Sequence, residues 1–342
     1  MIEIIPSEYT YIEELQQNDW NQLIVVCERL SLKCGIDITK EEMSEEIYHA
    51  ISDNPMLVVK MIPRETVEFL FELWDMKEPP LLLDPYRVQL YQLTFLGFAR
   101  LIDTKTISVN MEVKDMLFFY LKSHRISWIM EQYSQWEQVI FGMLFYYGII
   151  DLTYFYEVFC MIMDQEPEYE EFIEFIKVRI VFWGNTALLQ NEGTKKLYLS
   201  SKEVVDRNQV FQDWNENSDI GFHIFDREEY LAMARGNGVS VWDGIQELFQ
   251  FALDEVKDDK YECMILVKSI IVMIQNNSSY LDVVMKSSSI VDKNQEKEEE
   301  LCRILKRLFY STPLYGAKGY SRQELAEERK EPFHIIDGGK SK

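Results

Sequence analysis

Residues 93–109 read LTFLGFARLIDTKTISV, and residues 180–199 read IVFWGNTALLQNEGTKKLYL. Each stretch passes from the end of an apolar helical segment, through Gly97 or Gly184, into two runs of alternating side chains. A glycine that follows a helix accepts the left-handed cap conformation, and a period of two is typical of strands. Both stretches therefore predict a helix that ends at a glycine and leads into a β-hairpin, with turns at residues 103–105 and 191–193.

Further helices are predicted in front of each hairpin. They cover residues 65–74 before the first hairpin, and residues 136–147 and 152–163 before the second. Helices followed by a short hairpin are the layout of a winged-helix domain. The chain is also poor in glycine (14) and proline (9), which favours long helices. The predicted fold is mainly α, with helical bundle segments and two winged-helix-like units, each carrying a short β-hairpin.

The rest of the chain divides around these units. Polar residues 208–219 indicate a linker, Asp226 is the expected N-cap of a short helix at 227–234, and helices at 241–256, 260–275 and 295–310 form a bundle. The predicted domains are a small helical module (1–57), two winged-helix-like units (58–125 and 126–207), a linker with a short helix (208–239), the C-terminal helical bundle (240–330) and a flexible tail (331–342).

Two segments resemble known families. Residues 30–36 (LSLKCGI) and the helix start at 39–42 (TKEE), where Thr39 and Glu42 form a capping box, make residues 23–51 similar to the Rho N-terminal and SAP-type helical modules. Residues 312–325 (TPLYGAKGYSRQEL) resemble the C-terminal tail of uncharacterised bacterial helical proteins, some of which also carry a SEC-C zinc segment. The second resemblance implies a bacterial origin and no particular activity, and the zinc segment itself is missing because no cysteine follows Cys302.

The charge balance separates the C-terminal part from the rest. The chain carries a formal charge of −23, yet from Arg303 onward nine lysines and arginines stand against five acidic residues. Nucleic-acid affinity comes largely from cations that neutralise phosphates, so the acidic body disfavours that ligand. The candidate residues for facing a polyanion all lie in the C-terminal segment: Arg303, Lys306, Arg307, Lys318 and Arg322.

Composition also predicts the compartment. The five cysteines are odd in number and widely spaced, and the N-terminus lacks the basic and apolar regions of an export signal. Residues 139–163 are long and apolar enough to span a bilayer, but they contain Asp151 and Glu157. Gly148 and Asp151 favour two separate helices, the first ended by the glycine and the second capped by the aspartate. We therefore expect a cytoplasmic protein without membrane association.

No pattern of residues indicates a catalytic, metal or cofactor site. Glu46 and His49 have the Glu-x-x-His spacing of di-iron bundles, and Glu331 and His334 repeat it beside a proline. His124 has no such neighbour, and His223 lies three residues before Asp226 without a nucleophile motif nearby. Gly193-Thr194-Lys195 lacks the order of a phosphate-binding loop. No catalytic, cofactor-binding or metal residue is predicted.

The aromatic residues between 141 and 159 have two interpretations. Such a density is typical of a core, but four tyrosines are candidates for an interaction surface because a tyrosine hydroxyl needs a polar partner. These tyrosines are Tyr146, Tyr147, Tyr154 and Tyr156.

Three functions remain open. The leading hypothesis is a non-catalytic protein-interaction or regulatory module, because catalytic motifs are missing and the helix before the second hairpin is rich in glutamate. The alternative is a nucleic-acid-binding regulator that uses the wings or the basic C-terminal segment. The second alternative is an enzyme of unrecognised type, whose catalytic groups are scattered along the sequence.

Overall fold

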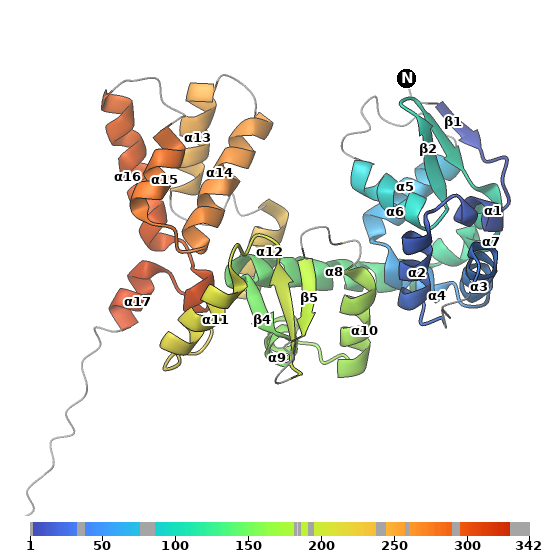
Figure 1. The fold of residues 1–342 in the computed structure, drawn as a ribbon, viewed down its shortest axis with the longest axis horizontal. Helices are drawn as coiled ribbons and strands as arrows, with labels where there is room; N and C mark the ends of the chain where they lie inside the picture. Colours follow the sequence, from blue (N-terminus) through green and yellow to red (C-terminus); the bar gives the residue numbers. More distant parts are fainter. Residues whose placement is uncertain are drawn as a thin grey trace, which may run out of the picture. The chain divides into compact units, whose positions relative to one another are not determined.

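The computed structural model describes residues 3–32, 38–75, 86–180, 183, 186–190, 195–236, 244–256, 260–288 and 295–328. Most of these residues lie in helices, and the strands form two small sheets, so the prediction of a mainly α fold is confirmed. Gly35, the glycine stop at Gly184, the second hairpin turn at 191–193, the Glu331–His334 pair and the tail at 331–342 lie outside the described residues. Figure 1 traces the chain in order.

The chain forms two compact units. Unit 1 contains Met1–Glu137 and Pro167–Gly184, and unit 2 contains Gln138–Glu166 and Asn185–Lys342. The helix α8 (His124–Tyr147) is continuous through the first boundary. Both hairpins are present, but the six predicted domains and the winged-helix interpretation of the hairpins stay predictions.

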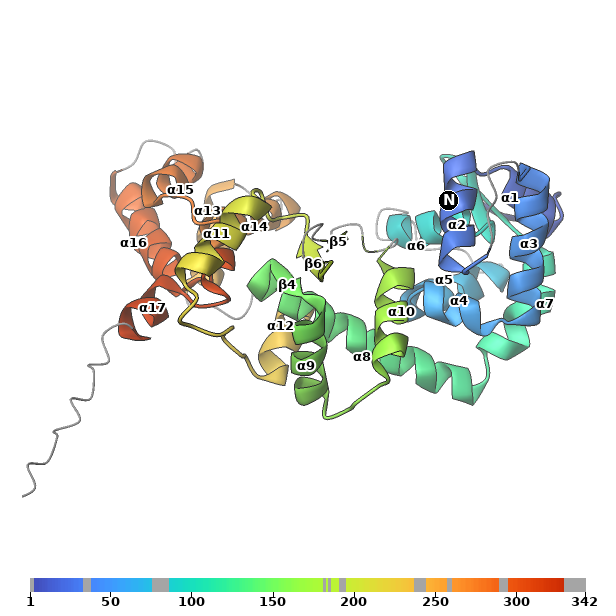
Figure 2. The ribbon, with the colours of Figure 1, turned by 60° about the horizontal axis from the view of Figure 1, so that its bottom comes forward.

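Unit 1 is a layer of short helices beside a three-stranded sheet. The helix α3 packs against α1 and α2 at the N-terminal end of the unit (Figure 2). The predicted capping box at Thr39 and Glu42 starts α3, as Thr10 and Glu13 do for α1. The helices are α1 (Tyr11–Gln16), α2 (Trp20–Arg29), α3 (Lys40–Asp53), α4 (Met56–Met61), α5 (Arg64–Trp74), α6 (Arg87–Phe95), α7 (Met111–Leu121) and α10 (Tyr169–Arg179).

The sheet of unit 1 contains the first predicted hairpin and one strand that was not predicted. Gly97 has a φ of +70° after α6, and the hairpin of β2 (Ala99–Asp103) and β3 (Thr106–Val109) follows. The strand β1 (Glu3–Pro6) pairs in parallel with β3, which gives the order β1-β3-β2. The N-terminus of the chain therefore completes a sheet whose hairpin lies about a hundred residues further on.

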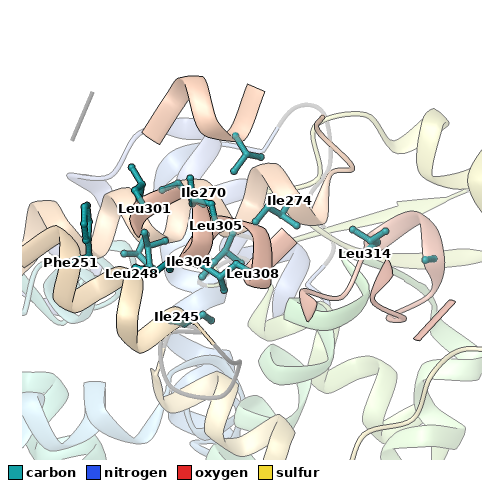
Figure 3. Close-up of a cluster of buried hydrophobic side chains, with 14 residues drawn as sticks. Ile245, Leu248, Phe251, Ile270, Ile274, Leu301, Ile304, Leu305, Leu308 and Leu314 are labelled. Carbon is teal, nitrogen blue, oxygen red and sulfur yellow. The ribbon is translucent and has the colours of Figure 1, made fainter. Parts of the chain in front are cut away.

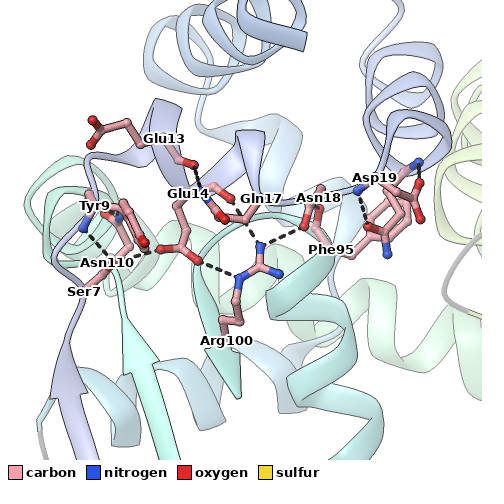
Figure 4. Close-up of polar contacts among 11 residues, drawn as sticks. Ser7, Tyr9, Glu13, Glu14, Gln17, Asn18, Asp19, Phe95, Arg100 and Asn110 are labelled. Atoms are coloured by element: carbon pink, nitrogen blue, oxygen red, sulfur yellow. Dashed lines mark hydrogen bonds and ion pairs between the residues drawn. The ribbon is translucent and has the colours of Figure 1, made fainter. Parts of the chain in front are cut away.

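A buried polar network ties α1 to this hairpin (Figure 4). The Arg100 Nε atom on β2 lies 2.8 Å from the Glu14 carboxylate, which is 3% exposed. The same guanidinium donates to Asn18 Oδ1 at 3.0 Å, and the Asn18 amide donates to the Phe95 carbonyl oxygen at 2.9 Å. Ser7, just after β1, donates its hydroxyl to the second Glu14 oxygen. Because every partner is satisfied, the network fixes the position of α1 and the segment after β1.

The apolar stretch 139–163 forms two helices, as predicted. The helix α8 ends at Tyr147, Gly148 has a φ of +66°, and Asp151 caps α9 (Leu152–Met163) by accepting from the Thr153 and Tyr154 amides. Between them lies β4 (Ile149–Asp151), which pairs with β6 (Leu197–Ser201) of the second hairpin, itself antiparallel to β5 (Thr186–Gln190). In the part of the chain that is described, no helix has the length and apolarity needed to cross a membrane.

The predicted linker at 208–219 is wrong, because most of it is the helix α11 (Arg207–Glu216). Asp206 caps this helix by accepting from the Asn208 and Gln209 amides. Val210 is buried, and the indole of Trp214 donates to the Tyr315 carbonyl oxygen at 2.8 Å. These side chains pack with Ile149, Val204 and Tyr315 in a small core of their own. The polar composition of residues 208–219 thus hid the fact that one face of α11 is apolar and packs against the core.

A bundle of four helices forms the C-terminal core of unit 2 (Figure 3). Its core is built from leucine, isoleucine and valine at helical spacing, such as Leu301, Ile304, Leu305 and Leu308. The bundle contains a helix that was not predicted, α15, which Ser279 caps. The helices of this part of the chain are α12 (Arg227–Gly236), α13 (Ile245–Val256), α14 (Lys260–Gln275), α15 (Tyr280–Ser287), α16 (Gln295–Ser311) and α17 (Arg322–Glu328), with the 3-10 turn η3 (Tyr315–Ala317) before the last.

Candidate functional site

Three of the five predicted cations of the C-terminal segment lie on the exposed side of α16. Its leucines and isoleucines face the bundle core, and this orientation places Arg303, Lys306 and Arg307 on the opposite, solvent-facing side. Residues three and four apart are neighbours on a helix surface, so the three cations form one patch. Tyr310 continues the same stripe and is 47% exposed. The packing of the bundle therefore decides which way the charges point.

A tight turn returns the chain so that α17 packs against α16. The Leu314 amide donates to the Tyr320 carbonyl oxygen at 3.0 Å, and Lys318 and Gly319 adopt φ values of +55° and +90°. Ser321 then starts α17 through a capping box with Glu324, because each side chain accepts from the other residue's amide. Arg322, the first residue of α17, is thereby brought beside the end of α16.

Arg322 is held in a fixed position on this surface. Its Nη1 atom donates to the Phe309 carbonyl oxygen at 3.0 Å, and its Nη2 atom donates to Asn277 Oδ1 at 2.9 Å. The guanidinium carbon lies 3.7 Å from the centre of the Phe309 ring, a cation–π contact. Partial burial lowers the pKa of Arg322 to about 10, so the side chain stays charged at neutral pH. The arginine is thus oriented without a carboxylate.

Together α16 and α17 enclose a groove of about 630 Å³. The groove brings together four of the five predicted polyanion-facing residues and only one carboxylate. The lining of the groove is therefore positively charged, although the chain as a whole is negatively charged. The lining residues are Arg303, Lys306, Arg307, Tyr310, Ser311, Arg322, Gln323, Ala326 and Glu327.

Half of the groove's positive charge is balanced by acidic neighbours. Arg307 forms an ion pair with Glu247 of α13, and Arg303 lies 3.7 Å from Glu300. Lys306 and Arg322 form no ion pair with any of the described residues. The groove therefore holds two cations whose charge is not compensated within the described part of the chain.

The fifth predicted cation, Lys318, serves a different purpose. Its Nζ atom donates to the carbonyl oxygens of Asn217 and Ile220, each at 2.8 Å. Burial lowers the pKa of this ammonium group. Lys318 thus joins the turn before α17 to the end of α11, and it does not line the groove.

Two of the four predicted surface tyrosines are buried, which corrects the prediction for Tyr146 and Tyr147. The Tyr146 ring stacks on Phe225 with centroids 3.7 Å apart. The Tyr147 hydroxyl donates to the His223 carbonyl oxygen and contacts the Tyr230 hydroxyl, both at 2.6 Å. Both side chains face inward because they anchor the segment before α12 to α8, and burial raises the pKa of the Tyr147 hydroxyl.

The other two tyrosines, Tyr154 and Tyr156, are partly exposed on α9. The Tyr154 ring stacks on Phe222 at a centroid distance of 5.0 Å, and partial burial raises its pKa. Neither residue lines the groove described above or the second cavity of unit 2, of about 330 Å³ between α8, the sheet and α14. An interaction surface at Tyr154 and Tyr156 stays a prediction.

His49 and His223 each lie beside aromatic side chains. No group of three or more histidine, cysteine or acidic side chains among the described residues is arranged to hold a metal ion. His49 is exposed beside Tyr48, and the His223 ring packs between Phe225 and Tyr320 with its Nε2 atom 4.0 Å from Glu324. Neither the groove nor the second cavity is lined by His223 or Asp226.

Comparison with protein-family models, curated proteins and solved structures gives no significant match to this chain. Its candidate site therefore has to be judged from its own geometry.

Of the nine lining residues, sequence reasoning missed three on α17 (Gln323, Ala326 and Glu327) and two on α16, Tyr310 and Ser311. The signal for the two on α16 was present, because positions 303, 307, 310 and 311 follow one helical stripe that continues the basic patch. No sequence pattern indicates that α17 forms the other side of the groove, because its position depends on how residues 312–321 return the chain to α16.

Proposed function

We propose that this protein is a non-catalytic interaction module that binds an acidic segment of another protein in the groove between α16 and α17. The observation that supports the proposal is the gathering of Arg303, Lys306, Arg307 and Arg322 around one groove of a chain with a net charge of −23. Acidic motifs are commonly recognised by clusters of arginine.

The surroundings of the groove favour a short protein segment over a nucleic acid. Beyond the cations, α16 begins with Glu296, Glu298, Glu299 and Glu300, and α17 ends with Glu327 and Glu328. A long phosphate backbone would have to pass these carboxylates, which repel it. A short acidic peptide needs to fit only the groove itself, and apolar side chains of that peptide can pack on Tyr310 and Ala326.

The nucleic-acid alternative rests on the same four cations and is therefore tested with the same variants. A regulator of that kind would bind a single-stranded oligonucleotide more tightly than an acidic peptide, with a steep salt dependence. A cytoplasmic site of action is part of the proposal, and the odd number and wide spacing of the five cysteines support a reducing compartment.

The test is fluorescence anisotropy with the full chain and a short labelled peptide in which glutamate alternates with leucine. We expect saturable binding that weakens with salt and is lost in the double variant Arg303→Glu and Lys306→Glu. The control variant is Lys286→Glu on α15, an exposed position of the same bundle outside the groove. Binding that survives the double variant, or that a labelled oligonucleotide exceeds, would overturn the proposal.

A further inference from the structure

We infer that the groove between α16 and α17 recognises a phosphorylated side chain, so that the partner segment is bound in its phosphoserine or phosphothreonine form. This inference rests on the proposed function and names the chemistry of its ligand. It follows from the number, type and arrangement of the polar groups that line the groove.

The first argument is a match of charge. Lys306 and Arg322 have no ion pair among the described residues, whereas Arg303 and Arg307 each have an acidic neighbour. With Glu327 also in the lining, Lys306, Arg322 and this carboxylate sum to about +1 (2 − 1), and the ion pairs of Arg303 and Arg307 are exposed to solvent, which weakens the compensation they give. A phosphorylated side chain carries a charge of about −1.5 to −2 at neutral pH, while a glutamate carries one. A phosphate group therefore attracts Lys306 and Arg322 more strongly than a single carboxylate would.

The second argument is the geometry of Arg322. Its hydrogen bonds to the Phe309 carbonyl oxygen and to Asn277 Oδ1, together with its contact with the Phe309 ring, fix the plane of the guanidinium before any ligand arrives. An arginine that is already oriented loses little conformational freedom on binding, and its planar fork matches the oxygens of a phosphate group. Lys306 sits on the opposite wall as a mobile point charge, which can follow the remaining phosphate oxygen.

The third argument is an unsatisfied hydroxyl group at the groove. Ser311 lines the groove, and its buried Oγ atom has no hydrogen-bond partner among the described residues. Buried polar atoms in proteins are almost always paired, so a lone hydroxyl marks a place where a partner is missing. A phosphate oxygen is a strong acceptor for such a donor.

The experiment compares two degenerate peptide libraries with the full chain. Both have a fixed central position between acidic flanks, and they differ only in carrying phosphoserine or serine there. We expect the phosphoserine library to bind at least about tenfold more tightly, since hydrogen bonds to charged groups exceed neutral ones by about 1.4 kcal/mol, which is tenfold in affinity. A glutamate library is the third arm, and it should bind close to the serine library.

Two variants assign the preference to the groove. Lys306→Gln should remove most of the phosphoserine preference, measured as the ratio of the affinities for the phosphoserine and serine libraries, and Lys286→Gln on α15 should change neither affinity. Arg322→Lys keeps the charge but loses the fork, so it should also reduce the preference. Arg322 contributes to the packing of α17, so Arg322→Lys can unfold this helix. In that case the Lys306 variant alone tests the inference.

A pH series separates phosphate from carboxylate recognition. The second ionisation of a phosphate monoester lies near pH 6, so the preference should fall as the pH is lowered from 7.5 to 5.5. The described lining residues include no histidine. Arg322 stays charged throughout this range, because its pKa of about 10 lies well above it.

The outcomes distinguish the inference from the proposed function. Equal binding of the phosphoserine and serine libraries would overturn the inference and leave the acidic-peptide proposal standing. Failure of all three libraries would overturn both. Competition of the phosphoserine library by inorganic phosphate alone at low concentration would show a free-phosphate site and also overturn the inference, as would tighter binding of a single-stranded oligonucleotide.

Discussion

The two hairpins follow the same local pattern but complete their sheets in different ways. In unit 1 the third strand is β1, which comes from the start of the chain and runs parallel to β3. In unit 2 the third strand is β4, which directly follows α8 and runs antiparallel to β6. The local pattern thus determines the hairpin, whereas the added strand depends on which other segment can pack against the exposed edge.

The two sheets are also held by different forces. The first is tied to α1 by the buried polar network of Glu14, Asn18 and Arg100. The second packs through Ile149 and Val204 against the Tyr315 ring, and the ion pair between Lys196 and Asp151 lies partly exposed to solvent. A close apolar contact is destabilised when volume is added to it, and a buried polar network is destabilised when one partner is removed. This contrast predicts which substitution damages which sheet.

The largest effect is expected for Gly148→Ala, which adds a methyl group at the start of β4. The new Cβ atom would lie 2.6 Å from the Tyr315 ring and 2.8 Å from Val204, at a φ of +66° that alanine disfavours. We expect a loss of about 3 kcal/mol in the opening free energy of β4 to β6, measured by hydrogen exchange with mass spectrometry. Gly97→Ala is the matched variant in unit 1.

Gly97→Ala should cost less, about 1.5 kcal/mol, in the exchange of β1 to β3. Its φ of +70° imposes the same backbone strain, but its Cβ atom would meet the end of the Leu15 side chain at 3.2 Å, which can move. Equal losses for the two variants would show that the Tyr315 ring can yield, and the packing difference between the sheets would be refuted.

The second effect concerns the buried network. Arg100→Ala leaves the Glu14 carboxylate buried without its cation, and it removes the hydrogen bonds to Asn18 and to the Glu14 carbonyl oxygen. We expect a loss of about 2 kcal/mol, confined to β1 to β3 and α1 in hydrogen exchange. The double variant with Glu14→Gln should recover part of this loss, because it removes the uncompensated charge. No recovery would show that the network acts by shape alone.

The difference between the sheets also marks how far the sequence alone leads. Gly97, Gly148 and the alternation at 99–109 and 186–201 are local signals, and the predicted hairpins and the α8–α9 break were found at those places. The strand β1 has only four residues, and its partner β3 lies far away in the sequence, so no local sequence pattern predicts it. The helix α11 was taken for a linker because its polar residues outnumber the few that pack.

The candidate site was predictable only in part, for a related reason. The basic residues were singled out by their charge against an acidic background, and those on α16 share a face because of helical periodicity. Whether α17 folds back onto α16 depends on the conformations of Lys318 and Gly319 and on Lys318 binding the end of α11. Burial of Tyr146 and Tyr147 likewise depends on Phe225 and Tyr230, some eighty residues away along the chain.

The smallest effect is expected at the ion pair of the second sheet. Lys196 lies 3.2 Å from Asp151, and its side chain is 61% exposed, so solvent and salt screen most of the attraction. The hydrogen bond to Asp151 raises the pKa of Lys196, which means that any stabilisation is present below the lysine's unfolded pKa and is lost as the pH rises through the folded value. Lys196→Ala should therefore leave the exchange of β4 to β6 at neutral pH indistinguishable from that of the unaltered protein, in contrast to Arg100→Ala in the first sheet. A loss as large as that of Arg100→Ala would mean that the second sheet is also held by charge, and the distinction between a polar and an apolar sheet would no longer stand.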